Sequence, residues 1–231
     1  GDGTHKTHIQ LNGVLTQVSH DLEAALRMLQ RLPETRYGMR YWIDALCINQ
    51  DDTQERNFQV KRMKNIYGTA RSVIVWLGPA SLDDEIALQI MNATYRDNDR
   101  NGWLVVPPEF GADHWRALCA FMRKPYWSRL WIIQELAANQ RFTLFSCGSK
   151  ELTRERLKLA VCCCQKLHKE EAAFTCYETD FWEISSRLFR LINLTPDIPK
   201  DDMLQKALSL AREAMASKEK DKVYGILALL D

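Results

Sequence analysis

The sequence lacks the features that place a chain in a membrane or on a nucleic acid. Lys and Arg number 31 and Asp and Glu number 30 among its 231 residues, so the formal net charge is only +1. Nucleic acids and anionic membranes select a strong basic excess or a basic stripe. The longest apolar runs, such as Val73–Leu77 and Leu157–Cys164, are far too short to cross a bilayer. We therefore expect no nucleic-acid partner and no membrane span.

Motifs for metals, bound nucleotides and disulfides are also missing. There is no Gly-rich phosphate loop, so a Rossmann or P-loop site is unsupported. No CxxC or HxxxH pair occurs, and Cys162–Cys164 are consecutive helical residues pointing about 100° apart, which cannot converge on one ion. The seven cysteines form an odd, irregularly spaced set, which favours a reducing compartment. With no signal peptide visible, the sequence predicts a cytoplasmic protein without metal or cofactor.

Apolar patterning predicts an α/β fold in a single domain over residues 1–231. Strands and helices alternate along the first two thirds of the chain, which indicates a parallel sheet wrapped by helices. The last third is almost all helical and is expected to pack as an appendage. After a hairpin at 9–16 with an Asn12-Gly13 turn, the predicted strands are 40–44, 72–77 and 141–147. The predicted helices are 22–31, 54–67, 82–95, 113–123, 128–138, 151–169, 179–191 and 201–217, and 223–230 is a short helix or strand.

Two segments turn abruptly from apolar to polar. Tyr41–Asp52 reads YWIDALCINQDD, an apolar run followed by Asp, Asn and Gln. Ser128–Ala137 reads SRLWIIQELA and places one carboxylate, Glu135, on a hydrophobic helix. Ligands of α/β sheets bind outside the carboxyl ends of the strands. The two segments are therefore predicted to meet at a small-molecule site.

These segments closely resemble the fungal heterokaryon incompatibility (HET) domain, in order and spacing, over nearly the whole chain. The resemblance implies a role in fungal allorecognition, innate immunity and programmed cell death, with self-association and contacts to other death-signalling domains. The family pattern normally opens with a strand similar to Ala-Leu-Ser-Tyr-x-Trp-Gly-Asp. Only Gly1-Asp2 of it is present, so that strand is expected upstream of Gly1. The matching pieces are Trp42–Gln50, Glu55-Arg56, Gln59-Val60, Met63, Ile66-Tyr67, Ala70, Val73–Gly78, Trp127–Ala137 and Asp221–Leu229.

The HET domain in turn is similar to the Toll/interleukin-1 receptor (TIR) domain. There a strand ends in Ile-Asp and a later helix carries Ser, Trp and Glu, which Ile43-Asp44, Ser128, Trp131 and Glu135 match here. This resemblance implies a TIR- or flavodoxin-like parallel sheet flanked by helices, with a helical insertion at 80–124 and a helical C-terminal part. Enzymatic TIR domains cleave NAD with the matching Glu, at sites often completed by a second copy. Glu135 is thus the implied catalytic residue and NAD the implied substrate.

The chemistry of such a site fits one carboxylate on a helix. Ser128, Trp131 and Glu135 are spaced three and four residues apart and share one face of the predicted helix. When the nicotinamide–ribose bond of NAD breaks, the leaving group departs neutral and the ribose becomes oxocarbenium-like, so a single anion can stabilise it. The plainer interpretation is that Glu135 is solvated, or pairs with Arg129 or Arg141.

The remaining candidates each have a structural alternative. Asp44, Asn49 and Gln50 are candidates for binding ribose hydroxyls or amide groups, whereas Asn49 and the following Asp51 and Asp52 also suit a turn and a helix cap.

Trp127 and Trp131 are candidates to stack on nicotinamide or adenine, or else belong to the core, with Tyr126 and Arg129 as further candidates. The sequence therefore leaves two functions open, an NAD-cleaving enzyme and a signalling module that works by contact alone. The second would use exposed apolar residues around 45–52.

Overall fold

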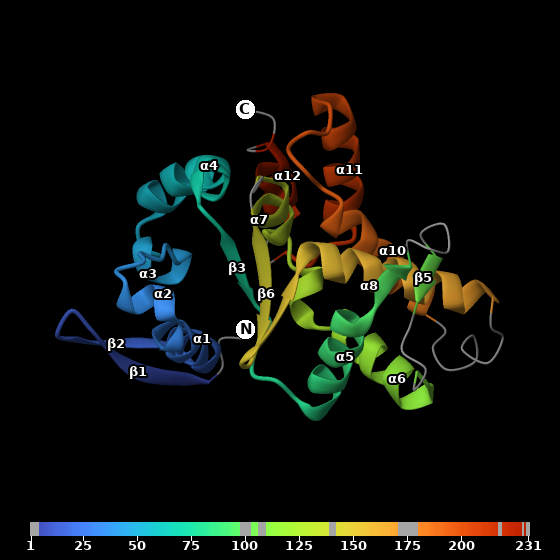
Figure 1. Ribbon diagram of the computed structural model, residues 1–231. Coiled ribbons are helices and arrows are strands. Elements are labelled where there is room, and N and C mark those ends of the chain that lie inside the picture. The colour runs from blue at the N-terminus through green and yellow to red at the C-terminus, as the bar shows by residue number, and fades with distance from the viewer. Residues whose placement is uncertain are drawn as a thin grey trace.

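The computed structural model describes residues 5–97, 103–105, 110–138, 142–170, 180–216, 219–227 and 229. Within them the chain is a mixed α/β protein that is mostly helical, and its sheets are small (Figure 1). Among the described residues no helix has the length and apolarity needed to cross a membrane.

The chain begins with the predicted hairpin. Strands β1 (Lys6–Leu11) and β2 (Val14–Ser19) pair antiparallel. Their turn has positive φ at Asn12 (50°) and Gly13 (84°), a conformation that Asn-Gly adopts readily. Helix α1 (His20–Arg31) follows, and the Ser19 hydroxyl caps it by accepting from the Leu22 amide at 3.2 Å.

The predicted strand at 40–44 is wrong. After α2 (Pro33–Arg36) the chain runs irregularly to α3 (Asp44–Cys47), then α4 (Thr53–Thr69). The Asp44 carboxylate accepts from the Ala45 amide at 2.7 Å, which starts a helical turn where a strand would have continued. Trp42 is half-buried and lies edge-on against Tyr67, 5.8 Å between ring centroids, so its apolar surface packs on α4 and not in a sheet.

The central sheet has the order β3-β6-β7. Strand β3 (Val73–Trp76) is parallel to β6 (Thr143–Cys147), as predicted, and β6 turns back antiparallel into β7 (Lys150–Thr153). The sequence reading assigned β7 to a helix that in fact starts at Arg154. A parallel arrangement thus holds for one strand pair, and a TIR- or flavodoxin-like sheet stays a prediction.

One edge of β3 has no strand beside it within the described residues. The Val73 amide donates to Phe142 at 2.9 Å and the Leu77 amide to Ser146 at 2.8 Å, both toward β6. Because peptide groups alternate along a strand, those of Ile74 and Trp76 point the other way.

Helices cover the sheet and fill the right side of Figure 1. Most begin and end within a few residues of their predicted positions, and the closing segment is helical. The 80–124 segment contains two helices and a short hairpin; Asn101-Gly102 and Pro107-Pro108 lie outside the described residues. The elements are α5 (Leu82–Ala93), β4 (Tyr95–Asp97), β5 (Trp103–Val105), α6 (Ala112–Met122), the 3-10 helix η2 (Pro125–Ser128), α7 (Ile132–Ala138), α8 (Arg154–Glu170), α10 (Phe181–Ile192), α11 (Lys200–Arg212) and α12 (Glu219–Leu227).

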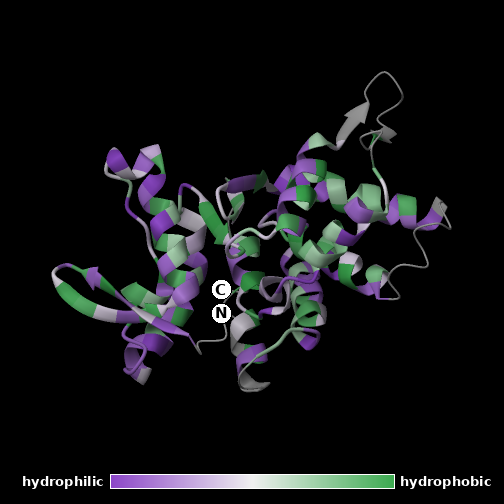
Figure 2. Cartoon of the chain, turned by 90° about the horizontal axis from the view of Figure 1, so that it is seen from below, coloured by the Kyte–Doolittle hydropathy of each residue, from purple (hydrophilic) through white to green (hydrophobic). Residues whose placement is uncertain are grey.

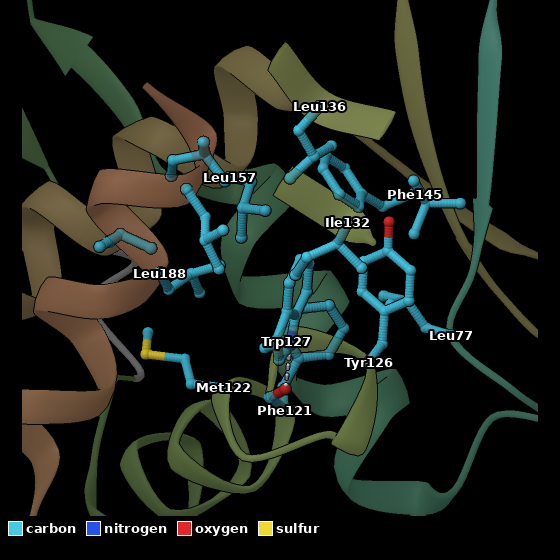
Figure 3. Packing of buried hydrophobic residues seen from close by; sticks show 14 of the residues in the cluster. Leu77, Phe121, Met122, Tyr126, Trp127, Ile132, Leu136, Phe145, Leu157 and Leu188 are labelled. Carbon is cyan, nitrogen blue, oxygen red and sulfur yellow. Dashed lines mark hydrogen bonds between the residues drawn. The ribbon is translucent and has the colours of Figure 1, made fainter. Parts of the chain in front are cut away.

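The hydrophobic core lies between this sheet and these helices. Phe145 of β6 is fully buried and packs against Trp127 of η2, with ring centroids 5.5 Å apart (Figure 3). Trp115 of α6 and Ile132 of α7 are buried to the same degree. The core therefore fixes η2 and α7, the two elements that carry the predicted site.

Candidate functional site

The segment 128–138 is not one continuous helix, so the predicted shared face of Ser128, Trp131 and Glu135 is wrong. Pro125 starts the short helix η2, and Arg129 after it is extended (φ −65°, ψ 145°). The Ser128 carbonyl accepts from the Met215 amide at 2.7 Å, a contact that ends η2. The α-helix restarts when the Trp131 carbonyl accepts from the amide of Glu135 at 3.2 Å. Glu135 thus lies in the first turn of α7, and Ser128 belongs to a different element.

A cavity of about 1900 Å³ separates the N-terminal elements from β3 and η2. One wall consists of α1, the irregular segment before α3, and the end of α4; the other consists of β3 and η2. It includes the open edge of β3. Residues with polar groups on its walls at the end near α7 are Asp44, Tyr67, Tyr126, Ser128, Arg129 and Glu135. The cavity therefore brings together Asp44 and Glu135, the two predicted carboxylates, although 91 residues separate them in the chain.

Glu135 is partly buried on the cavity wall. The Tyr126 hydroxyl donates to its Oε2 at 2.7 Å. Burial raises the pKa of the Glu135 carboxyl above its usual value, and the negative charge of Asp44 adds to this rise. The positive charge of Arg129 and the hydrogen bond from Tyr126 oppose it. The carboxylate is thus neither fully solvated nor surrounded only by cations.

Arg129 is exposed and forms no ion pair with Glu135, judged over the residues that the structure describes. Its guanidinium carbon lies 5.7 Å from the centroid of the Tyr126 ring, a cation–π contact. The alternative partner, Arg141, lies outside the described residues. Arg129 is therefore close enough to influence Glu135 while its guanidinium stays accessible from the cavity.

Two tyrosines flank the acid, one from α4 and one from η2. Burial raises the pKa of both Tyr67 and Tyr126, and the nearby charge of Glu135 raises it further. Both phenols stay protonated at neutral pH, so the Tyr126 hydroxyl remains a hydrogen-bond donor to the carboxylate. Tyr67 was not predicted as a site residue, because its position on the apolar face of a helix is typical of a core residue.

Of residues 44–52, Asp44 and Ala45 of α3 line the cavity. Asp44 is exposed and lines it, whereas Asn49 and Gln50 are not on its wall. Asn49 Oδ1 accepts from the Asp51 amide and Gln50 Nε2 donates to the Asp44 carbonyl, both at 3.1 Å. Asn49 and Gln50 thus shape the turn, and Asp52 caps α4 as predicted, accepting from the Gln54 amide at 2.8 Å.

The tryptophans predicted to stack on a ligand lie elsewhere. Trp127 is only 3% exposed, and its Nε1 donates to the Phe121 carbonyl at 2.9 Å within the core (Figure 3). Trp131 is half-buried and does not line the cavity. The indoles on the cavity wall are instead those of Trp42 and of Trp76 in β3.

No group of three His, Cys, Asp or Glu close enough to hold a metal ion occurs in the described ranges. Cys163 and Cys164 are buried free thiols, and Cys162 is half-buried.

Comparison with known proteins identifies the family. The family model described as heterokaryon incompatibility protein (HET) matches residues 1–135, more than half of the chain. The chain belongs to the HET family. A curated relative, Heterokaryon incompatibility protein 6, OR allele, of Neurospora crassa, is 28% identical over 172 residues. This alignment covers 60% of the present chain and 25% of the relative, so the chain spans about a quarter of that protein's length. No solved structure matches.

The HET match includes the parts of the cavity wall described above. Its range, residues 1–135, contains Asp44, Tyr67, Tyr126 and Glu135, as well as all of β3. The helices α8 to α12 lie beyond it. The segments that surround the cavity are thus mostly those that define the family, and the later helices complete the core behind α7.

Proposed function

We propose that this HET domain is a cell-death effector of heterokaryon incompatibility and that it cleaves NAD at the nicotinamide–ribose bond, with Glu135 as the catalytic residue. One observation carries the proposal: the Glu135 carboxylate, partly buried and held by Tyr126, lines a cavity of about 1900 Å³ together with Asp44. The resemblance to enzymatic TIR domains supplies the substrate class.

The reaction needs one well-placed anion. The nicotinamide of NAD is a cationic pyridinium; when its bond to the ribose C1′ breaks, the bonding electrons go to nicotinamide, which leaves neutral. The positive charge moves to the ribose, where the Glu135 carboxylate stabilises it, more strongly because the group is shielded from water. Water then adds to C1′ and releases a proton, giving ADP-ribose and nicotinamide.

The neighbouring residues would bind and orient the substrate. The Tyr126 hydroxyl occupies one carboxylate oxygen of Glu135 and so fixes the direction in which the other faces. Asp44 is an exposed acceptor suited to the two hydroxyls of a ribose. The accessible guanidinium of Arg129 suits the pyrophosphate, which planar guanidinium groups bind well.

Self-association is part of this proposal. Asp44 and Arg129 are both exposed, so the walls near Glu135 are open to solvent. A second copy covering this opening would exclude water and strengthen each electrostatic interaction inside. The isolated domain is therefore expected to be weakly active and to gain activity when clustered.

The test is nicotinamide release from NAD by artificially dimerised protein. Wild type is expected to turn over; Glu135→Gln, which keeps the size of the side chain, should lose at least about a hundredfold. Glu183→Gln, an exposed residue of α10 that does not line the cavity, is the matched control and should keep full activity. Absence of turnover in clustered, folded wild type would refute the catalytic proposal.

A signalling module without catalysis is the second candidate, and one observation favours it. Val14 and Leu15 in the hairpin are 64% and 72% exposed, and Tyr37 is 90% exposed. Around the 45–52 loop, where such residues were expected, Ile48 is buried instead. If expression of Glu135→Gln still kills cells whereas Leu15→Ser does not, the domain acts by contact and not by catalysis.

A further inference from the structure

A buried ion pair stands at the carboxyl ends of β3 and β6. Lys124 Nζ lies 2.9 Å from Asp84 Oδ2, and the two side chains are only 17% and 6% exposed. The same Asp84 oxygen accepts from the amide and the hydroxyl of Ser81, at 2.9 and 2.8 Å. Burial alone would raise the pKa of Asp84, but these hydrogen bonds and Lys124 hold it below its usual value. Asp84 is therefore a fixed anion, tied to the start of α5.

This pair fixes the residue from which η2 begins. The Lys124 amide donates to the Phe121 carbonyl at 3.2 Å, and its own carbonyl accepts from the Trp127 amide at 3.0 Å. Tyr126, one residue after Pro125, reaches from η2 to Glu135. The position of the Tyr126 hydroxyl consequently depends on where the Lys124 backbone is held.

The net contribution of this ion pair to the stability of the fold is expected to be small. Removing two charges from water costs about as much as their attraction returns, and well-packed neutral side chains of similar size often stabilise a protein equally. A buried pair is better understood through the geometry that it imposes. Here it joins the N-terminus of α5 to the N-terminus of η2, and its Lys124 lines the cavity.

We infer that the Lys124–Asp84 ion pair is a positioning device that holds η2 so that the Tyr126 hydroxyl meets Glu135. Lys124 lines the cavity, but neither member of the pair is bonded to Glu135, and the pair acts on the acid through Tyr126. This role applies to the protein without substrate. Only its effect on catalysis rests on the proposed function.

The direct test is the titration of the Glu135 carboxyl, followed by NMR of protein labelled with carbon-13 at the Glu carboxyl groups and assigned through Glu135→Gln. Besides Tyr126, the charged groups that act on this carboxyl are Asp44 and Arg129. Tyr67 is a further titratable neighbour, because its own pKa is raised by the charge of Glu135. Because the Tyr126 hydrogen bond favours the ionised form, Tyr126→Phe should raise the pKa of Glu135.

The decisive variant is the double change Asp84→Asn with Lys124→Met, which removes both charges and leaves none buried alone. If the pair positions Tyr126, this variant should reproduce most of the rise seen in Tyr126→Phe, and adding Tyr126→Phe to it should change little more. Arg123→Met is the matched control, since Arg123 precedes Lys124 and forms an exposed ion pair with Asp180. It should leave the titration unchanged.

A folded double variant in which Glu135 titrates as in wild type would overturn the inference, whatever the loss of stability. If the double variant does not fold, the single change Asp84→Asn, whose amide oxygen still accepts from Ser81, is titrated in the same way. A raised pKa of Glu135 supports the inference, and an unchanged one overturns it. Nicotinamide release is measured separately. If clustered wild type does not cleave NAD, the proposed function is contradicted and the titration result stays valid. If it does cleave NAD, the pH–rate profile of the double variant should shift from that of wild type in the same direction as the pKa of Glu135.

Discussion

The N-terminal region, residues 5–52, and the core around β3 and β6 are built differently. In the N-terminal region the most buried side chains, Val18 and Ile48, keep 7% of their surface exposed. In the core Phe145 and Leu136 are completely buried. The N-terminal region also has a two-stranded sheet of its own, and a lone hairpin is marginally stable in water. The difference shows that the core holds itself together, whereas the N-terminal region depends on what packs against it.

The cavity lies at the border between these regions, and each region supplies one of its carboxylates. Glu135 comes from the core, where α7 is fixed by buried neighbours on both sides. Asp44 comes from α3, a short helix whose residues are not buried. Figure 2, coloured by hydropathy, shows a hydrophobic stretch along the hairpin and mixed hydrophobic and hydrophilic stretches along the helices of the core. A carboxylate from the buried core thus lines the cavity with one from a more exposed segment.

The largest effect is expected from Phe145→Ala. Phe145 is fully buried in β6 and packs on Trp127, so its removal leaves a large cavity in the core and should cost about 3–5 kcal/mol of unfolding free energy. Urea denaturation followed by tryptophan fluorescence measures the loss. A cost below about 1 kcal/mol would mean that the core is not the rigid region described here.

Leu29→Ala should have a smaller and local effect. Leu29 is the most buried leucine of α1, with 9% of its surface exposed, and its truncation should cost about 2 kcal/mol. The loss should appear as faster amide hydrogen exchange in α1 and the hairpin, with exchange in β6 unchanged. Equal acceleration in both regions would show that they unfold as one unit and would remove the contrast.

Glu135→Gln should stabilise the protein near neutral pH. Because the pKa of Glu135 is higher in the folded than in the unfolded state, the folded state binds the proton more tightly, and stability falls as pH rises from the unfolded value of about 4.3 through the folded one. The variant escapes this fall. Its advantage over wild type in thermal melts should be present at pH 7 and vanish below about pH 4. A variant that is less stable at pH 7 would contradict the description of Glu135 as an acid shielded from water.

Leu15→Ser should have the smallest effect on folding. Leu15 is 72% exposed in the hairpin, so the change should alter the unfolding free energy by less than about 0.5 kcal/mol. Chemical denaturation checks this value. A clear loss of stability would mean that the hairpin packs against something in solution, for which analytical ultracentrifugation of wild type and variant gives the direct evidence.

The sequence predicted the parts of the fold that local chemistry determines. Asn12-Gly13 defined the hairpin, and Asp52 caps α4 as expected. The prediction of a strand at 40–44 was wrong because Trp42 packs on Tyr67 of α4, a tertiary contact that the local sequence does not indicate. The prediction of one helix over 128–138 was wrong because the Ser128 carbonyl accepts a hydrogen bond from the amide of Met215, which is distant in the sequence.

The same division applies to the site. Glu135 and Asp44 were identified from short motifs, and the cavity contains both. That the Tyr126 hydroxyl binds the carboxylate and that Tyr67 lies near it could not be predicted, since the two tyrosines come from separate helices whose packing decides their positions. Trp127 had the residue type of a stacking platform but the environment of a core residue.

The catalytic proposal requires NAD to bind in this cavity with its nicotinamide ribose beside residue 135. An NMR titration of the uncleaving variant Glu135→Gln with NAD tests it most directly. We expect saturable amide shifts that concentrate at Asp44, Tyr126 and Arg129 on the cavity wall, and none of comparable size at the remote Glu183. Shifts that are absent at millimolar NAD, or that concentrate away from this cavity, would contradict the account.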